Sequence, residues 1–308
     1  MKTIVEAKGI VKRYGEKNVV DGIDFEVSRG EIFGLLGPNG AGKSSVMKMM
    51  YGASAISEGE LFVIGLNAKK NFREIKSRVG VIPQEDGLDE EFTVFENLML
   101  YAGYQLIDKN VARPRAEDLL RLMHLEDHRD KFIPELSGGL RRRLTIARGM
   151  INNPEVLFLD EPTAGLDPDI RLWVWEFLEK IRAEMGTVVL TTHYMEEAER
   201  LCDRVAILEN GKILALGAPA QLILSKIGAE VVELKVEQKD LGYYLERLKE
   251  NNFRYQVVGS SINVHLDEGQ NNQDVLSLVF SRQVTIRRPN LNDVFLRLAG
   301  HNLRGEPV

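Results

Sequence analysis

The chain has 308 residues, of which 44% are hydrophobic and 28% charged, a composition typical of a folded protein with one large and one smaller domain. A net charge of -6, with acidic and basic residues mixed along the chain, argues against a nucleic-acid partner. The single cysteine, Cys202, excludes an intramolecular disulfide, and the absence of a secretory signal and of the roughly 18 consecutive apolar residues of a membrane span favours a cytoplasmic protein.

Two runs of alternating apolar and polar residues begin the chain and predict a β-hairpin over residues 4–14 and 19–27. Tyr14 ends the first run. An aromatic residue at this place is either packed on the strands or free to stack on a base. Because a nucleotide loop follows, we favour stacking on adenine.

A glycine-rich turn between an apolar strand and a helix follows at residues 30–53. It fits the pattern G-x-x-x-x-G-K-[ST], in which backbone N–H groups surround a phosphate chain, the lysine adds charge and the serine can bind magnesium. The helix that begins near Lys43 directs its positive end at the same phosphates. The predicted nucleotide-binding residues are Gly37, Pro38, Asn39, Gly40, Ala41, Gly42, Lys43, Ser44 and Ser45.

A strand over residues 79–83 ends at Gln84, whose amide oxygen could reach a metal ion or a water, although loop glutamines are often simple surface residues. Apolar residues then recur at helical spacing and predict a helical insertion at about residues 85–150. The acidic residues at its start favour a solvated loop over a metal cluster.

A second helix start carries Ser137, Gly138 and Gly139 directly before a helical pattern. The serine can cap the helix and leave the next N–H groups free for a phosphate, although an ordinary capped helix would have the same sequence. Two such starts suggest that both hold one nucleotide, with the halves supplied by two subunits. The arginines at 141–143 are predicted to form a solvated helix face.

An apolar run over residues 156–159 predicts a buried parallel strand ending in Asp160 and Glu161. Neighbouring side chains of a strand point apart, so we expect Asp160 to face magnesium and Glu161 a water, with Pro162 holding Glu161 extended. A strand over residues 187–192 ends at His193. These patterns predict an α/β fold, a mostly parallel sheet flanked by helices with its polar residues at one edge.

Residues 1–225 resemble the nucleotide-binding subunit of an ATP-binding cassette (ABC) transporter, because the family's motifs occur in the family order. The motifs are the aromatic Tyr14, the Walker A loop from Gly37 to Ser44, the Q-loop Gln84, the signature from Leu136 to Gly139, the Walker B pair Asp160 and Glu161, and the switch residue His193. The resemblance implies a P-loop NTPase fold with an N-terminal antiparallel β part. It also implies a head-to-tail dimer in which each ATP lies between one Walker A loop and the partner's Ser137, Gly138 and Gly139.

The resemblance also implies a role for each site residue in hydrolysis of ATP with Mg²⁺. Lys43 and the loop N–H groups would neutralise the phosphates, and the metal ligands would be Ser44, Gln84 and, through water, Asp160. Glu161 would polarise the attacking water, while His193 would orient it. Leu140 stands where most members carry glutamine, and we expect activity to survive this difference.

From about residue 229 to 308 the pattern changes to strand, helix, strand, strand, helix, strand, a ferredoxin-like order that predicts a small α+β accessory domain. A capped helix ending at Gly300 follows, similar to the ending of stand-alone ATPase subunits of bacterial exporters for drugs, sodium ions or lipid-linked glycans. For this domain we favour a role in subunit contact over ligand sensing or stabilisation.

The leading interpretation is an ATPase subunit that powers export by a separate membrane permease, as a homodimer or with a paired cassette, peripheral on the cytoplasmic face of the cell membrane. The alternative is a soluble ABC-type ATPase acting on the ribosome or nucleic acid, which usually has two cassettes or a long coiled coil; this chain has one cassette and no sustained heptads. A small-molecule kinase would leave Ser137, Gly138, Gly139 and His193 without a purpose.

Overall fold

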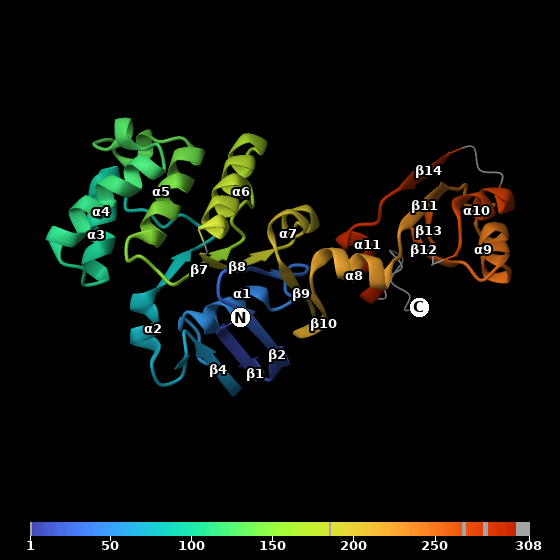
Figure 1. Cartoon of the computed structure of the whole chain (residues 1–308), viewed down its shortest axis with the longest axis horizontal. Coiled ribbons are helices and arrows are strands. Elements are labelled where there is room, and N and C mark those ends of the chain that lie inside the picture. Colours follow the sequence, from blue (N-terminus) through green and yellow to red (C-terminus); the bar gives the residue numbers. More distant parts are fainter. Residues whose placement is uncertain (1, 185, 267–268, 280–282, 300–308) are drawn as a thin grey trace. The chain divides into compact units, whose positions relative to one another are not determined.

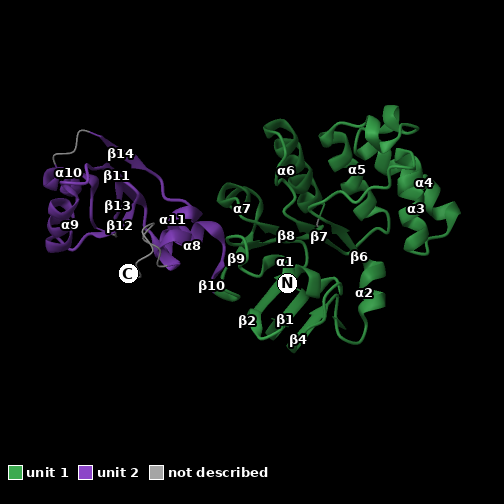
Figure 2. Ribbon diagram, turned by 180° about the vertical axis from the view of Figure 1, so that it is seen from behind, with its two compact units in different colours: residues 1–213 green, residues 214–308 purple. Residues whose placement is uncertain are grey.

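The computed structural model describes residues 2–184, 186–266, 269–279 and 283–299. The chain divides into two compact units, residues 1–213 and 214–308 (Figure 2). The sequence-based boundary at residues 225–229 falls inside the second unit and stays a prediction about domain organisation. Within the described residues, no helix is long and apolar enough to cross a bilayer.

An antiparallel sheet forms the N-terminal part of the first unit, as predicted. It contains β1 (Thr3–Tyr14), β2 (Lys17–Ser28), β4 (Glu58–Val63) and β5 (Leu66–Asn67) in the order β2-β1-β4-β5. The pairing of Tyr14 with Lys17 closes the β1–β2 hairpin, and a one-sided alternation of buried residues along β2 fits a sheet with one face on the core.

Most strands of the central sheet are apolar and buried on both faces, which is characteristic of parallel pairing. Its order is β10-β9-β3-β8-β7-β6, and the four neighbouring pairs from β9 to β6 are all parallel. The strands are β3 (Ile32–Leu36), β6 (Val79–Ile82), β7 (Val156–Asp160), β8 (Thr187–Thr192), β9 (Arg204–Glu209) and β10 (Lys212–Gly217). This sheet confirms the predicted fold class.

Helices follow most of these strands. The chain forms α1 (Lys43–Met50) after β3 and α2 (Phe72–Arg78) before β6. Between β6 and β7 come α3 (Val94–Tyr104), α4 (Lys109–Leu122) and α5 (Gly138–Met150), which Figure 1 shows packed beside one another. The chain continues through α6 (Pro168–Ala183) and α7 (Met195–Leu201). The helices α3, α4 and α5 therefore confirm the helical insertion that the spacing of apolar residues predicted.

The second unit has the predicted ferredoxin-like order. Its elements are α8 (Pro219–Lys226), β11 (Glu230–Lys235), α9 (Leu241–Glu250), β12 (Arg254–Val258), β13 (Ser261–Leu266), α10 (Asn272–Leu278), β14 (Val284–Arg287) and α11 (Leu291–Leu298). The sheet order β12-β13-β11-β14 is antiparallel throughout, with a core that includes Val232, Ile262 and Val264 beneath α9 and α10. The predicted helix end at Gly300 lies outside the described residues.

His265 of β13 gives the second unit an expected pH dependence. Its side chain is 3% exposed, and burial lowers its pKa from 6.5 to about 4 despite the opposing charge of Asp293. The arginines at 254, 287 and 297 lower it further. The folded unit therefore keeps this imidazole neutral, whereas the unfolded chain takes up a proton below its ordinary pKa.

The stability from neutral His265 should be complete above pH 6.5 and lost as the pH falls towards 4, by about 2 kcal/mol between pH 7 and pH 5. Hydrogen exchange of β13 amides in the full chain, corrected for the intrinsic effect of pH, measures this loss. His265→Gln should flatten the dependence, and His124→Gln, at an exposed position, should not. Equal pH dependence in His265→Gln and the unchanged chain would contradict the assignment.

Candidate functional site

The predicted site residues that follow the strands β3, β6, β7 and β8 come together at one edge of the central sheet. Leu36 at the end of β3 pairs with Thr192, and Asp160 at the end of β7 pairs with Thr191. Because the strands are parallel and in register, the loops that follow them begin side by side. The next strand, β6, ends alongside β7 with Ile82 opposite Leu159. Hence the segments that contain the phosphate loop, Gln84, Glu161 and His193 all start from this edge.

A cavity of about 330 Å³ lies over this edge and is formed largely by the glycine-rich loop. The residues that line it are Val19, Asn39, Gly40, Gly42, Lys43, Ser44, Ser45, Gln84 and Glu161. Sequence segments more than a hundred residues apart therefore contribute to one cavity, which is what a nucleotide site at a strand edge requires.

Lys43 is 4% exposed and reaches back along its own loop, donating hydrogen bonds to the carbonyl oxygens of Gly37 (2.8 Å) and Pro38 (3.1 Å). Burial lowers the pKa of its ammonium group, and the nearby charge of Glu161 opposes that shift. The Nζ atom lies 3.6 Å from Oε1 of Glu161. Next to it, the buried Ala41 donates its N–H to the Pro38 carbonyl at 3.2 Å.

Two positions of the loop require glycine because backbone carbonyls of other segments lie too close for a Cβ atom. At Gly42, where φ is +105°, an added Cβ would lie 2.6 Å from the carbonyl oxygen of Val19. At Gly37 it would lie 2.2 Å from the carbonyl oxygen of Leu208. The tight curl of the loop therefore depends on residues without a side chain.

The neighbouring carboxylates point apart, as predicted. Asp160 accepts hydrogen bonds from the hydroxyls of Ser44 (3.0 Å) and Thr191 (2.5 Å). Glu161 turns to the other side, where Oε2 lies 3.2 Å from Nδ1 of His193 without a hydrogen bond. The two acids thus occupy different surroundings, one beside hydroxyl oxygens and the other beside a lysine and a histidine.

The backbone of Glu161 differs from the prediction. Its φ is +46°, in the left-handed region, so it is not held extended. The N–H of Glu161 donates to both the carbonyl and the hydroxyl oxygen of Thr191, at 3.2 and 2.9 Å. Pro162 disfavours the right-handed helical region for the preceding residue, and the bonds to Thr191 then favour the left-handed region over the extended one. Such a conformation in a residue with a Cβ costs about 1–2 kcal/mol.

Tyr14 is 52% exposed, and its hydroxyl lies 3.5 Å from that of Ser54. The hydroxyl of Ser54, and less strongly that of Ser45, lowers the pKa of Tyr14. Since Ser45 lines the cavity, the tyrosine lies beside it, with Nζ of Lys12 over its ring at 4.7 Å from the centroid.

The helix start at Ser137, which the sequence predicted as a second phosphate site, does not line this cavity. Ser137 and Gly138 are exposed, and the Ser137 hydroxyl accepts the N–H of Leu140 at 3.4 Å, which makes it the N-cap of α5. An added Cβ at Gly139 would lie 2.4 Å from Ile170 of α6, so this glycine also allows two helices to approach. Among the described residues that line the cavity, none belongs to the segment from Ser137 to Gly139.

The arginines after this segment do not form a solvated face, contrary to the prediction. Arg142 is 5% exposed, and burial lowers its pKa to about 10. Arg143 lies over the ring of Trp173, 4.5 Å from the ring centroid. Arg142 is buried and Arg143 half-buried because α5 packs against α3, α4 and β6, a tertiary arrangement that a run of charged residues does not reveal.

Comparison with known proteins identifies the family. The sequence profile described as ABC transporter matches residues 20–164. The chain is also 42% identical, over 300 residues, to the Nod factor export ATP-binding protein I of Burkholderia thailandensis, an alignment that covers 97% of this chain and 98% of that protein. This chain belongs to the ATP-binding proteins of ABC transporters. The family resemblance, the P-loop NTPase fold and the ATPase activity predicted from the sequence are thereby confirmed.

Solved structures agree with this assignment. The ATP-binding subunit of an ABC transporter is 30% identical and has a TM-score of 0.65, covering 72% of this chain and 92% of that one. A bacterial ABC transporter cassette, solved as a dimer, is 25% identical with a TM-score of 0.63, covering 70% of this chain and 98% of that one. Neither the relatives nor these structures support an ATPase that acts on the ribosome or nucleic acid.

Sequence reasoning missed Thr191, which binds Asp160 through its hydroxyl and holds the backbone of Glu161. The signal was a pair of threonines at the end of a strand with an apolar middle, next to the strand that carries the acids. It also missed Val19 of β2, which lines the cavity of this ABC protein and has no distinguishing chemistry.

Proposed function

We propose that this ABC protein is the ATPase subunit of an exporter, working as a pair of cassettes bound to a permease on another chain at the cytoplasmic face of the membrane. The observation that carries this proposal is the cavity that joins Lys43, Gln84 and Glu161 at one sheet edge. Export agrees with the name of the Burkholderia relative, which matches this chain along nearly its whole length.

Within this proposal the phosphates of ATP are held by Lys43 and by the loop N–H groups, which the glycines leave free to converge. The hydroxyl of Ser44, the amide of Gln84 and the carboxylate of Asp160 offer oxygen atoms only, the donor type that Mg²⁺ prefers. The ion, when bound, neutralises charge on the phosphates. Glu161 takes the proton of the attacking water, and His193, 3.2 Å from it, orients that water.

A single chain supplies half of such a site. Ser137 and Gly138 are exposed and the described cavity lining does not include them, so we propose that they meet the nucleotide bound by a second copy. The dimeric cassette of similar fold shows that this architecture can pair. We propose subunit contact as the role of the accessory domain at residues 229–308.

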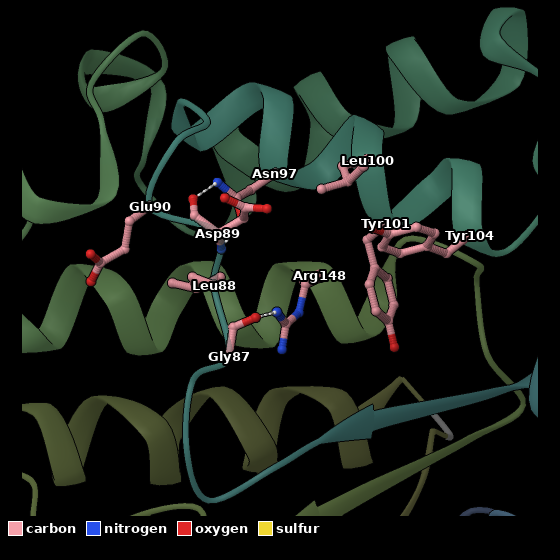
Figure 3. A pocket seen from close by; sticks show the side chains of 9 residues that line it. All are labelled: Gly87, Leu88, Asp89, Glu90, Asn97, Leu100, Tyr101, Tyr104 and Arg148. Carbon is pink, nitrogen blue, oxygen red and sulfur yellow. Dashed lines mark hydrogen bonds between the residues drawn. The ribbon is translucent and has the colours of Figure 1, made fainter.

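The permease, we propose, docks at a second cavity of about 420 Å³ in the first unit. Figure 3 shows Tyr101 and Tyr104 on one side of Arg148, and Glu90 on the other. Arg148 donates to the carbonyl of Gly87 at 2.6 Å, which fixes the loop after Gln84 against α5. Since that loop leads directly to Gln84, a permease helix seated here would touch a segment continuous with the ATP cavity.

Tyr104 is 71% exposed at the rim of this cavity. Tyr104→Asp should therefore weaken permease binding about 30-fold, as loss of an aromatic anchor does. The ATP turnover of the isolated chain should stay within about twofold of that of the unchanged chain. Co-purification with the co-expressed permease measures binding. Tyr243→Asp, at an exposed tyrosine of the second unit, is the matched control. Undiminished co-purification of Tyr104→Asp would place the permease elsewhere.

A further inference from the structure

Arg142 connects segments that the sequence treats as separate motifs. It lies on α5, five residues after Ser137. Its Nε donates to the carbonyl oxygen of Pro162 at 2.9 Å, and its Nη1 donates to that of Pro83 at 2.8 Å. Pro83 immediately precedes Gln84, and Pro162 immediately follows Glu161. One buried side chain therefore spans the backbones beside two residues that line the ATP cavity.

A buried carboxylate accompanies this arginine. Glu197 of α7 is fully buried, and its Oε1 accepts hydrogen bonds from the Thr163 hydroxyl (2.7 Å) and the Trp175 indole (3.0 Å). Its other oxygen and Nη2 of Arg142 are both buried without a hydrogen-bond partner among the described residues. The charge of Glu197 favours the protonated arginine and opposes the cost of burying it.

We infer that Arg142, held by the charge of Glu197, is a positioning residue that sets the distance between Gln84 and Glu161. The inference rests on the roles proposed above for those two residues. A guanidinium suits this task because its donors form a rigid planar fork that can bind two carbonyls at once, whereas an ammonium group is a single point charge. A displacement of α5 would consequently change the spacing of two groups that must act together on water and metal.

Arg142→Met removes both donors and keeps a long unbranched side chain. Its kcat for ATP should fall about tenfold, because small displacements of reacting groups are costly, while KM stays within about twofold, because the phosphate loop is not touched. Arg142→Lys should recover part of kcat through one of the two bonds. Arg143→Met removes a neighbouring arginine that contacts Trp173 and the Met123 carbonyl, neither of which lines the cavity, and should stay within about twofold of the unchanged chain.

Glu197→Gln provides a second test, because the glutamine side-chain oxygen can still accept the hydrogen bonds of Thr163 and Trp175 while the negative charge is lost. This variant tests the inference even if Arg142→Met does not fold. It should lower kcat severalfold in the unchanged chain and have no effect when Arg142 is already methionine, which has no charge for Glu197 to hold. Unchanged kcat in both Arg142→Met and Glu197→Gln, or equal losses in Arg142→Met and Arg143→Met, would overturn the inference. Failure of the unchanged chain to hydrolyse ATP would instead refute the proposed function.

Discussion

Replacement of Glu161 by glutamine is expected to lower ATP turnover by about 10²–10⁴-fold, the contribution of a positioned general base. Glutamine has the shape of glutamate but cannot take a proton from water. The change leaves Asp160 bound to the hydroxyls of Ser44 and Thr191, so metal binding should persist. It also leaves Lys43 on its loop carbonyls, and ATP affinity should therefore stay near that of the unchanged chain.

Single-turnover hydrolysis and equilibrium binding of ATP, both on the full chain, separate the two effects. We also expect Glu161→Gln to accumulate as an ATP-bound dimer, detectable by light scattering. Glu196→Gln removes an exposed carboxylate from the first turn of α7 and should hydrolyse ATP normally. Turnover of Glu161→Gln close to that of the unchanged chain would remove Glu161 from the role of base.

The location of this site could be predicted because it depends on strand ends. A parallel strand is recognisable as a short apolar run, and the register of such strands places whatever follows them at one edge. That argument brought Gly37, Gln84, Asp160 and His193 together from sequence alone. The order of elements in the second unit was predictable for a similar reason, since each strand and helix there has a clear period of apolar residues.

The contacts that hold the site could not be predicted in this way. An arginine in a charged run has the same sequence signal whether it faces solvent or, like Arg142, binds two backbone carbonyls inside the protein. Likewise, Pro162 restricts the backbone of Glu161 but allows both the extended and the left-handed conformation. The hydrogen bond from Glu161 N–H to Thr191, on another strand, stabilises the left-handed one. Both outcomes depend on partners that are distant in sequence.

Gly138→Asp is expected to reduce turnover by about 10³-fold, because like charges about 4 Å apart near a protein surface repel by about 4 kcal/mol. The stability of the chain itself should not fall. An added Cβ at Gly138 meets nothing within 4 Å, and a carboxylate in the first turn of α5 stabilises that helix by about 0.3–1 kcal/mol. The unfolding temperature should thus hold or rise and ATP binding by the isolated chain should stay the same, while turnover falls.

Gly138→Asn, which has the same size without the charge, should retain more turnover than Gly138→Asp, and the difference measures repulsion of phosphate. Unimpaired turnover of Gly138→Asp would show that α5 does not begin at a nucleotide. A loss of ATP affinity in the isolated chain would place Gly138 in its own cavity, against the lining described above.

Mixing the two defective chains tests whether one nucleotide is shared between two copies. When Gly138→Asp and Glu161→Gln chains are combined without ATP and allowed to exchange, about half of the pairs are mixed, and each mixed pair contains one site with an intact Glu161 and an intact partner helix. Turnover should then recover to about one quarter of that of the unchanged chain, if the two sites act independently. If Gly138 and Glu161 served a nucleotide within the same chain, every site in the mixture would keep one defect and no recovery would occur.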